Sequence, residues 1–146
     1  MVWARMNERV LVAFDGSPPA TRAARFAAEH FADADILLVT VVDPYDSLHG
    51  AYGGVDLFGS QRPDDTHEEA MADLEEVVEL FDDTSSVTTE VGMGRPAHTI
   101  LDYAEKNEVD HIVLGSHGRE GAERVLLGSV AETVLRRASV PVTVVR

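Results

Sequence analysis

The chain has 146 residues, of which 26 are acidic and 12 are Lys or Arg, giving a formal net charge of −14, and it contains no cysteine. This length predicts one domain with a full hydrophobic core, and the lack of cysteine excludes disulfide bonds and thiolate metal sites. The negative charge argues against duplex nucleic acid or an anionic membrane as a partner, because both require a basic face.

The basic residues have an unusual composition, since Lys106 is the only lysine and the others are arginines. High acid content with almost no lysine favours a protein from a halophilic archaeon, because molar salt screens self-repulsion beyond ~3 Å. The alternative is an ordinary acidic protein. No apolar run reaches the roughly 20 residues of a membrane span, and the N-terminus lacks the apolar segment of a signal peptide. We therefore expect a cytoplasmic protein.

The first third of the chain has the pattern of a strand, a helix and a second strand. Residues 1–7 show no periodicity, and we expect an extension there. The apolar run 10–14 predicts a strand buried on both faces, followed by Ser17 as N-cap and Pro18 at the first helical position. Alanines at helical spacing come next, and residues 36–42 predict the second strand of a βαβ unit.

The rest of the chain continues this alternation after an interruption. Residues 43–63 combine glycines and aromatic residues without a period, which predicts a long mobile loop or flap. The strand at 87–91 alternates apolar and polar residues, so we expect it near a sheet edge. The later elements are expected as helix 64–81, strand 87–91, helix 96–104, strand 111–114, helix 129–137 and strand 140–145. Five strands alternating with four helices predict a single α/β domain, an open parallel sheet with helices on both faces.

A set of glycines follows the strand at 111–114, namely Gly115, Gly118 and Gly128, and Ser129 then opens a helix. Backbone N–H groups freed by glycines and by the first helical turn, together with the helix dipole, can hold phosphates. Ser129 and Glu132 also match the capping-box pattern S-x-x-E. The alternative is that these glycines only form turns.

The pattern Gly-x2-Gly-x9-Gly-Ser resembles the nucleotide-binding signature of the universal stress protein family. The resemblance covers nearly the whole chain, because it extends to segments 10–17, 38–43, 92–96 and 141–145. It implies a Rossmann-like sheet of strand order 3-2-1-4-5, in which Asp15 and Gly115 follow neighbouring strands at a switch point where ligands bind. The nucleotide-binding residues that it implies are Ala13, Asp15, Val41, Gly115, Gly118, Arg119, Gly128, Ser129 and Val130.

The resemblance also implies a function and partners. The ligand would be ATP, with or without Mg²⁺, and the protein would be a stress-response or signalling module. It would form a homodimer through the apolar strand 141–145, which would otherwise be an exposed sheet edge. The alternatives are a slow ATP hydrolase and a family member that binds no nucleotide and acts through protein contacts.

The sequence leaves two roles open for Asp15 and for Arg119. Asp15 either binds ribose hydroxyls or the adenine amino group, or forms an Asx-turn that caps the first helix. Arg119 is either a phosphate ligand or a solvated loop residue. His117 is interpreted as structural or solvent-facing rather than catalytic.

Other chemistries find little support in the sequence. Segment 92–97 matches the dinucleotide fingerprint G-x-G-x-x-G/A, but the acid expected at the end of the next strand is missing, so we reject NAD binding. The six histidines lack metal-ligand spacing, and there is no P-loop or nucleophile elbow. We therefore predict neither a metal site nor catalytic residues.

Overall fold

The computed structural model describes residues 7–44, 63–117 and 127–146. Its elements are β1 (Arg9–Ala13), α1 (Pro18–His30), β2 (Asp35–Val42), α3 (Pro63–Val78), β3 (Val87–Met93), α4 (Pro96–Lys106), β4 (His111–Gly115), α5 (Ser129–Arg137) and β5 (Val142–Val145). The expected alternation of strands and helices is confirmed. The predictions for the N-terminal extension and for the loop after β2 fall almost wholly outside the described residues, as do those for Gly118 and Arg119.

The five strands form one parallel sheet in the order β3-β2-β1-β4-β5, which confirms the strand order implied by the family resemblance. β1 lies at the centre, pairing Val12 with Leu38 of β2 on one side and with Val113 of β4 on the other. β3 and β5 are the two edges, so the predicted edge position of the third strand is also confirmed. All carboxyl ends of the strands therefore lie along one side of the sheet.

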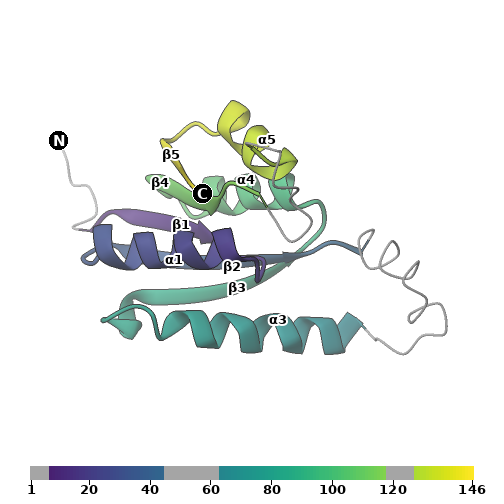
Figure 1. The fold of residues 1–146 in the computed structure, drawn as a ribbon, viewed down its shortest axis with the longest axis horizontal. Coiled ribbons are helices and arrows are strands. Elements are labelled where there is room, and N and C mark those ends of the chain that lie inside the picture. Colours follow the sequence, from purple (N-terminus) through teal and green to yellow (C-terminus); the bar gives the residue numbers. More distant parts are fainter. Residues whose placement is uncertain (1–6, 45–62, 118–126) are drawn as a thin grey trace.

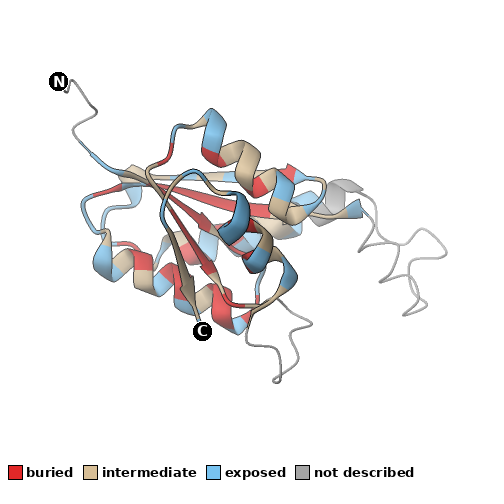
Figure 2. Cartoon of the chain, turned by 90° about the horizontal axis from the view of Figure 1, so that it is seen from above, coloured by how far each residue is buried: buried red, intermediate tan, exposed pale blue. Residues whose placement is uncertain are grey.

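Helices cover both faces of this sheet and bury two separate apolar clusters. On one face, Val10, Val12 and Leu38 pack with α1 and α3. On the other, Leu11, Val39 and Ile112 pack with α4 and α5. Figure 1 shows α4 and α5 together on one side of the sheet and α3 on the other, and Figure 2 shows the buried residues concentrated in the strands and on the sheet-facing sides of the helices. The central strands are apolar at successive residues because both of their faces are buried.

Helix α1 begins as the sequence predicts. Ser17 is its N-cap, with a buried Oγ that accepts a hydrogen bond from the Ala20 amide at 3.2 Å, and prolines occupy the first helical positions. A side-chain acceptor at the N-cap satisfies one of the amides that the first turn leaves without an intrahelical partner. The buried face of α1 is mainly alanine, so the helix lies close to the sheet. The start of α1 therefore also packs closely against the end of β4.

Candidate functional site

The turn after β1 is built around Asp15. Its Oδ1 accepts a hydrogen bond from the Ser17 amide at 2.9 Å, and Gly16 between them has φ of 83°, a conformation that favours glycine. The Asx-turn is therefore confirmed, whereas the cap of α1 is Ser17 and not Asp15. The Asp15 side chain is nevertheless exposed at the carboxyl edge of the sheet, and its role in ligand binding stays a prediction.

The end of β4 packs directly against the start of α1. A Cβ on Gly115 would lie 2.8 Å from the Pro19 carbonyl carbon and from the Ala20 backbone nitrogen. Backbone atoms at that distance cannot move aside as a flexible side chain could, so only glycine fits here. Gly115 thus serves the packing of α1 on β4, whatever its part in binding.

Ser116, the next residue, links three elements and was not singled out from the sequence. It is 2 % exposed, its amide donates to the carbonyl of Val145 at 2.7 Å, and its carbonyl accepts from the Gly128 amide at 2.6 Å. Its Oγ lies 3.0 Å from Nδ1 of His117, a contact in line with a structural role for that histidine. Ser116 therefore fixes the start of α5 beside the ends of β4 and β5.

The predicted capping box at Ser129 is wrong. Gly128 is the N-cap of α5 and makes no side-chain cap bond, whereas Ser129 is the first helical residue and is exposed. A Cβ on Gly128 would lie 3.0 Å from the Cα of His117, so the approach to the preceding loop favours glycine at the cap. Glu132 instead pairs with Arg136, at 2.9 Å between Oε1 and Nη2.

The first turn of α5 has the geometry of an anion site. The helix ladder starts with the Glu132 amide donating to the Gly128 carbonyl, so the amides of Ser129, Val130 and Ala131 precede any intrahelical acceptor. These donors and the positive end of the helix dipole favour a phosphate or carboxylate nearby.

Three apolar residues of the predicted set share one face of the sheet. Ala13, Val41 and Val130 are half-buried, and all three pack against the core cluster between the sheet and helices α4 and α5. They come from β1, β2 and the first turn of α5, at the carboxyl side of the sheet. The fold thus brings seven of the nine predicted residues to this edge, and Gly118 and Arg119 lie outside the described residues.

The described residues contain no group of three or more His, Asp or Glu side chains that could hold a metal ion. Within the same residues, no helix is long and apolar enough to cross a membrane. The glycines of the dinucleotide-like segment have structural reasons, because a Cβ on Gly92 would meet Thr99 at 2.7 Å and Gly94 has φ of 138°.

In an open α/β sheet, ligands bind outside the carboxyl ends of the strands at the switch point, where this chain places the N-terminus of α5. Comparison with known proteins gives the family: residues 6–146 match the model of the universal stress protein family, to which the chain belongs. Universal stress protein MJ0531 of Methanocaldococcus jannaschii is 36 % identical over 97 % of this chain and 83 % of its own length. Universal stress protein YxiE of Bacillus subtilis is 32 % identical over 97 % of this chain and all of its own length.

Solved structures share the fold. That of protein MJ0577 of M. jannaschii superposes with a TM-score of 0.79 at 27 % identity, over 97 % of this chain and 96 % of the other. Two more distant structures are complexes of universal stress proteins with nucleotides. One holds cAMP (TM-score 0.67, 22 % identity, 95 % and 96 % covered) and one, from Archaeoglobus fulgidus, holds dAMP (TM-score 0.61, 24 % identity, 97 % and 100 % covered). At these identities the likeness to the two complexes is one of fold.

Proposed function

We propose that this protein binds an adenine nucleotide, ATP with or without Mg²⁺, at the carboxyl ends of β1 and β4, and acts as a stress-response or signalling module. The position of the first turn of α5 carries the proposal. The hydrogen bond from the Gly128 amide to the Ser116 carbonyl, at 2.6 Å, holds this turn beside the end of β4. Its donors suit phosphate groups that lie along the switch point.

The other parts of a nucleotide have matching surfaces. The half-buried Ala13, Val41 and Val130 offer an apolar surface for the purine, and the exposed carboxylate of Asp15 can accept hydrogen bonds from ribose hydroxyls. Gly118 and Arg119, within the family signature, are assigned to the phosphates. The cAMP and dAMP complexes of two fold neighbours add support, because those proteins hold adenine nucleotides on the same fold.

Ligand-induced stabilisation tests this proposal directly. ATP at ~100 times its dissociation constant stabilises a native protein by about 2.7 kcal/mol, which for a domain of this size raises the melting temperature by roughly 5–10 °C. Mass spectrometry of protein purified in molar salt should also detect bound nucleotide. If ATP, ADP and AMP all leave the melting temperature unchanged, nucleotide binding is refuted and a role through protein contacts replaces it.

We further propose that the protein is a homodimer joined through β5. In the described part of the chain, β5 pairs with β4 only, and its other edge has no partner strand. All four residues, Val142–Val145, are half-buried, and three of them are valines. An apolar edge strand of this kind is usually covered, and an equivalent strand across a two-fold axis would cover it.

A further inference from the structure

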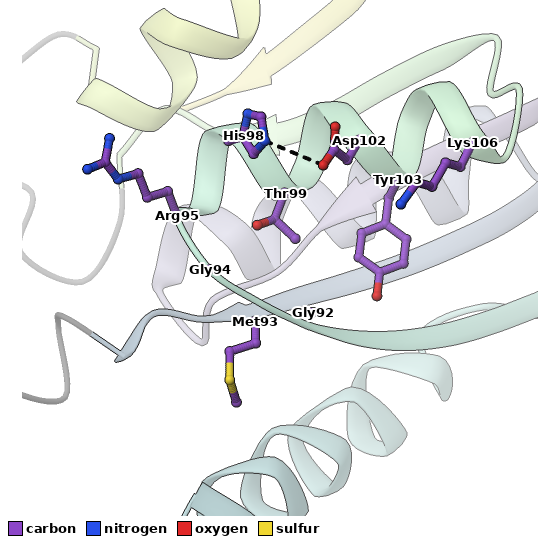
Figure 3. Close-up of a pocket in the computed structure, with 9 residues that line it drawn as sticks. All are labelled: Gly92, Met93, Gly94, Arg95, His98, Thr99, Asp102, Tyr103 and Lys106. Carbon is purple, nitrogen blue, oxygen red and sulfur yellow. Dashed lines mark ion pairs between the residues drawn. The ribbon is translucent and has the colours of Figure 1, made fainter.

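A cavity lies between α4 and the end of β3. Its volume is about 360 Å³, and the residues that line it are Gly92, Met93, Gly94, Arg95, His98, Thr99, Asp102, Tyr103 and Lys106. We call this cavity the outer groove. Figure 3 shows Thr99 and Tyr103 on the side of α4 toward Gly92 and Gly94, whereas His98 and Asp102 lie on another side of the helix. The segment that matched a dinucleotide fingerprint therefore borders a cavity.

The outer groove lies beside the proposed nucleotide site, because Gly92 of β3 pairs with Val41 of β2. Ala97, Leu101 and Tyr103 of α4 all pack against the apolar cluster that Ala13 and Val41 also contact. Thr99 and Tyr103 also lie against β3, where a Cβ on Gly92 would touch both of them. A ligand in the outer groove would contact the end of β3 and α4, two elements that contribute no residue to the predicted nucleotide-binding set.

The outer groove has hydrogen-bond donors that the protein does not use. Among the described residues, the hydroxyls of Thr99 and Tyr103 and the ammonium group of Lys106 have no hydrogen-bond or ion-pair partner. Burial, and next the negative charge of Glu90, raise the pKa of Tyr103 above its ordinary value. The phenol therefore stays protonated at neutral pH and remains a donor.

Charges of both signs meet around these donors. Lys106 is the only lysine of a chain with net charge −14, and Arg95 stands at the other end of α4. Asp102 lines the same cavity, with its Oδ2 3.5 Å from Nε2 of the exposed His98, and Glu90 lies within electrostatic reach of Tyr103. A simple anion would be repelled by the carboxylates, and a simple cation by Lys106 and Arg95. A ligand that carries one positive and one negative charge can be attracted by the carboxylates and by the basic groups at the same time.

We propose that the outer groove binds a small zwitterion of the amino-acid class. Its carboxylate is held by Lys106 and by the hydroxyls of Tyr103 and Thr99, and its ammonium group faces Asp102. The Tyr103 ring adds a surface for the ligand's apolar part and for its ammonium group. The volume of about 360 Å³ lies within the range of small-molecule sites.

The test uses three probes that differ in charge: L-leucine, N-acetyl-L-leucine, which lacks the ammonium group, and L-leucinamide, which lacks the carboxylate. Each is titrated into the ¹⁵N-labelled full chain in molar salt with ATP present. We expect L-leucine to shift the amide signals of Gly92, Gly94 and Thr99 in a saturable way. The other two probes should bind at least about tenfold more weakly, because each loses one charge-assisted contact.

Two charge-removing variants complete the test. Lys106→Met should weaken L-leucine binding by about tenfold or more, whereas Arg25→Met, on an exposed position of α1, should leave it unchanged. Unchanged melting temperatures show that both variants fold. The proposal is overturned if no probe gives saturable shifts, if N-acetyl-L-leucine or L-leucinamide binds as tightly as L-leucine, or if the two variants behave alike. The nucleotide proposal survives any of these results, since ATP is assayed separately.

Discussion

At the carboxyl edge of the sheet, packing requires glycine at position 115 and favours it at position 128. Gly115 lies against the backbone of Pro19 and Ala20, and Gly128 lies against His117. We predict that Gly115→Ala destabilises the protein by about 1–3 kcal/mol, because the new methyl group forces α1 away from β4. The melting temperature without ligand should fall by roughly 2–10 °C. A variant as stable as the wild type would show that α1 can shift at no cost.

Gly118 provides the contrasting variant, since it belongs to the nucleotide signature by sequence. We predict that Gly118→Val abolishes the rise in melting temperature with ATP, because a side chain would intrude on the phosphates or forbid the loop's dihedral angles. The melting temperature without ATP should stay within a few degrees. Asp15→Ala should weaken ATP binding less, but it should also destabilise the free protein, since Asp15 holds the turn before α1. If Gly118→Val instead lowers stability without ATP, this glycine serves the fold.

Tyr103 gives the protein a predictable response to alkaline pH. Burial and the charge of Glu90 raise the pKa of Tyr103 above 10.0 in the folded protein. At a pH between the pKa of the unfolded chain and that of the folded protein, the unfolded chain therefore binds fewer protons than the native one. Stability is therefore unaffected below pH ~10 and falls as the pH rises through the folded pKa. We expect the melting temperature of the wild type to fall more steeply above pH ~10 than that of Tyr103→Phe. Parallel curves for the two proteins would contradict the shift.

At the scale of elements, β5 is held in place within one chain. The Ser116 amide donates to Val145, and Nε of Arg22 donates to the carbonyl of Arg146 at 2.7 Å. The strand is thus ordered before it meets a partner. Val144 also packs against the apolar cluster between the sheet and helices α4 and α5, so the melting temperature of its variant is measured to separate loss of association from loss of folding. We predict that Val144→Lys converts the dimer to a monomer, with light scattering in molar salt giving the mass.

The matched control places the same charge on the other edge of the sheet. Thr88 is an exposed residue of β3, and Thr88→Lys should leave the dimer intact if β5 is the interface. If Thr88→Lys dissociates the dimer and Val144→Lys does not, the interface is at β3 rather than at β5. A monomeric wild type would remove the dimer proposal altogether.

The two serines that precede helices show where sequence reasoning succeeds and where it stops. Ser17 caps α1 as predicted, because that cap depends on the local run of serine and two prolines. Ser129 does not cap α5, because the N-cap is set by a long-range contact of Gly128 with Ser116 and His117, which no local pattern contains. Periodicity located the strands for the same local reason, whereas their order came from the family resemblance. The linking role of Ser116 depends on β5 and α5 meeting β4, so only the structure reveals it.

At the scale of the molecule, part of the net charge of −14 lies on α3, where neighbouring acidic residues are not balanced by basic ones. On α3, Glu69, Asp73 and Glu76 follow one another at helical spacing and are exposed. Like charges at this spacing repel by about 0.2–0.5 kcal/mol per pair, and no basic residue in the last turn of α3 offsets the helix dipole. Such repulsion acts over about 10 Å in 0.1 M salt and about 3 Å in 1 M salt.

We therefore predict that stability rises with salt, and that raising salt from about 0.1 M to about 3 M increases the melting temperature. The double variant Glu69→Gln with Glu76→Gln tests the cause. Removing two of the three charges relieves repulsion only where salt does not already screen it, so the variant should gain stability over the wild type in low salt and little in high salt. Thermal melting of both proteins across the salt range measures this difference. A wild-type melting temperature independent of salt would refute the prediction that the protein is adapted to high salt. A gain of equal size at both ends of the range would mean that side-chain helix propensity, rather than charge, explains the variant.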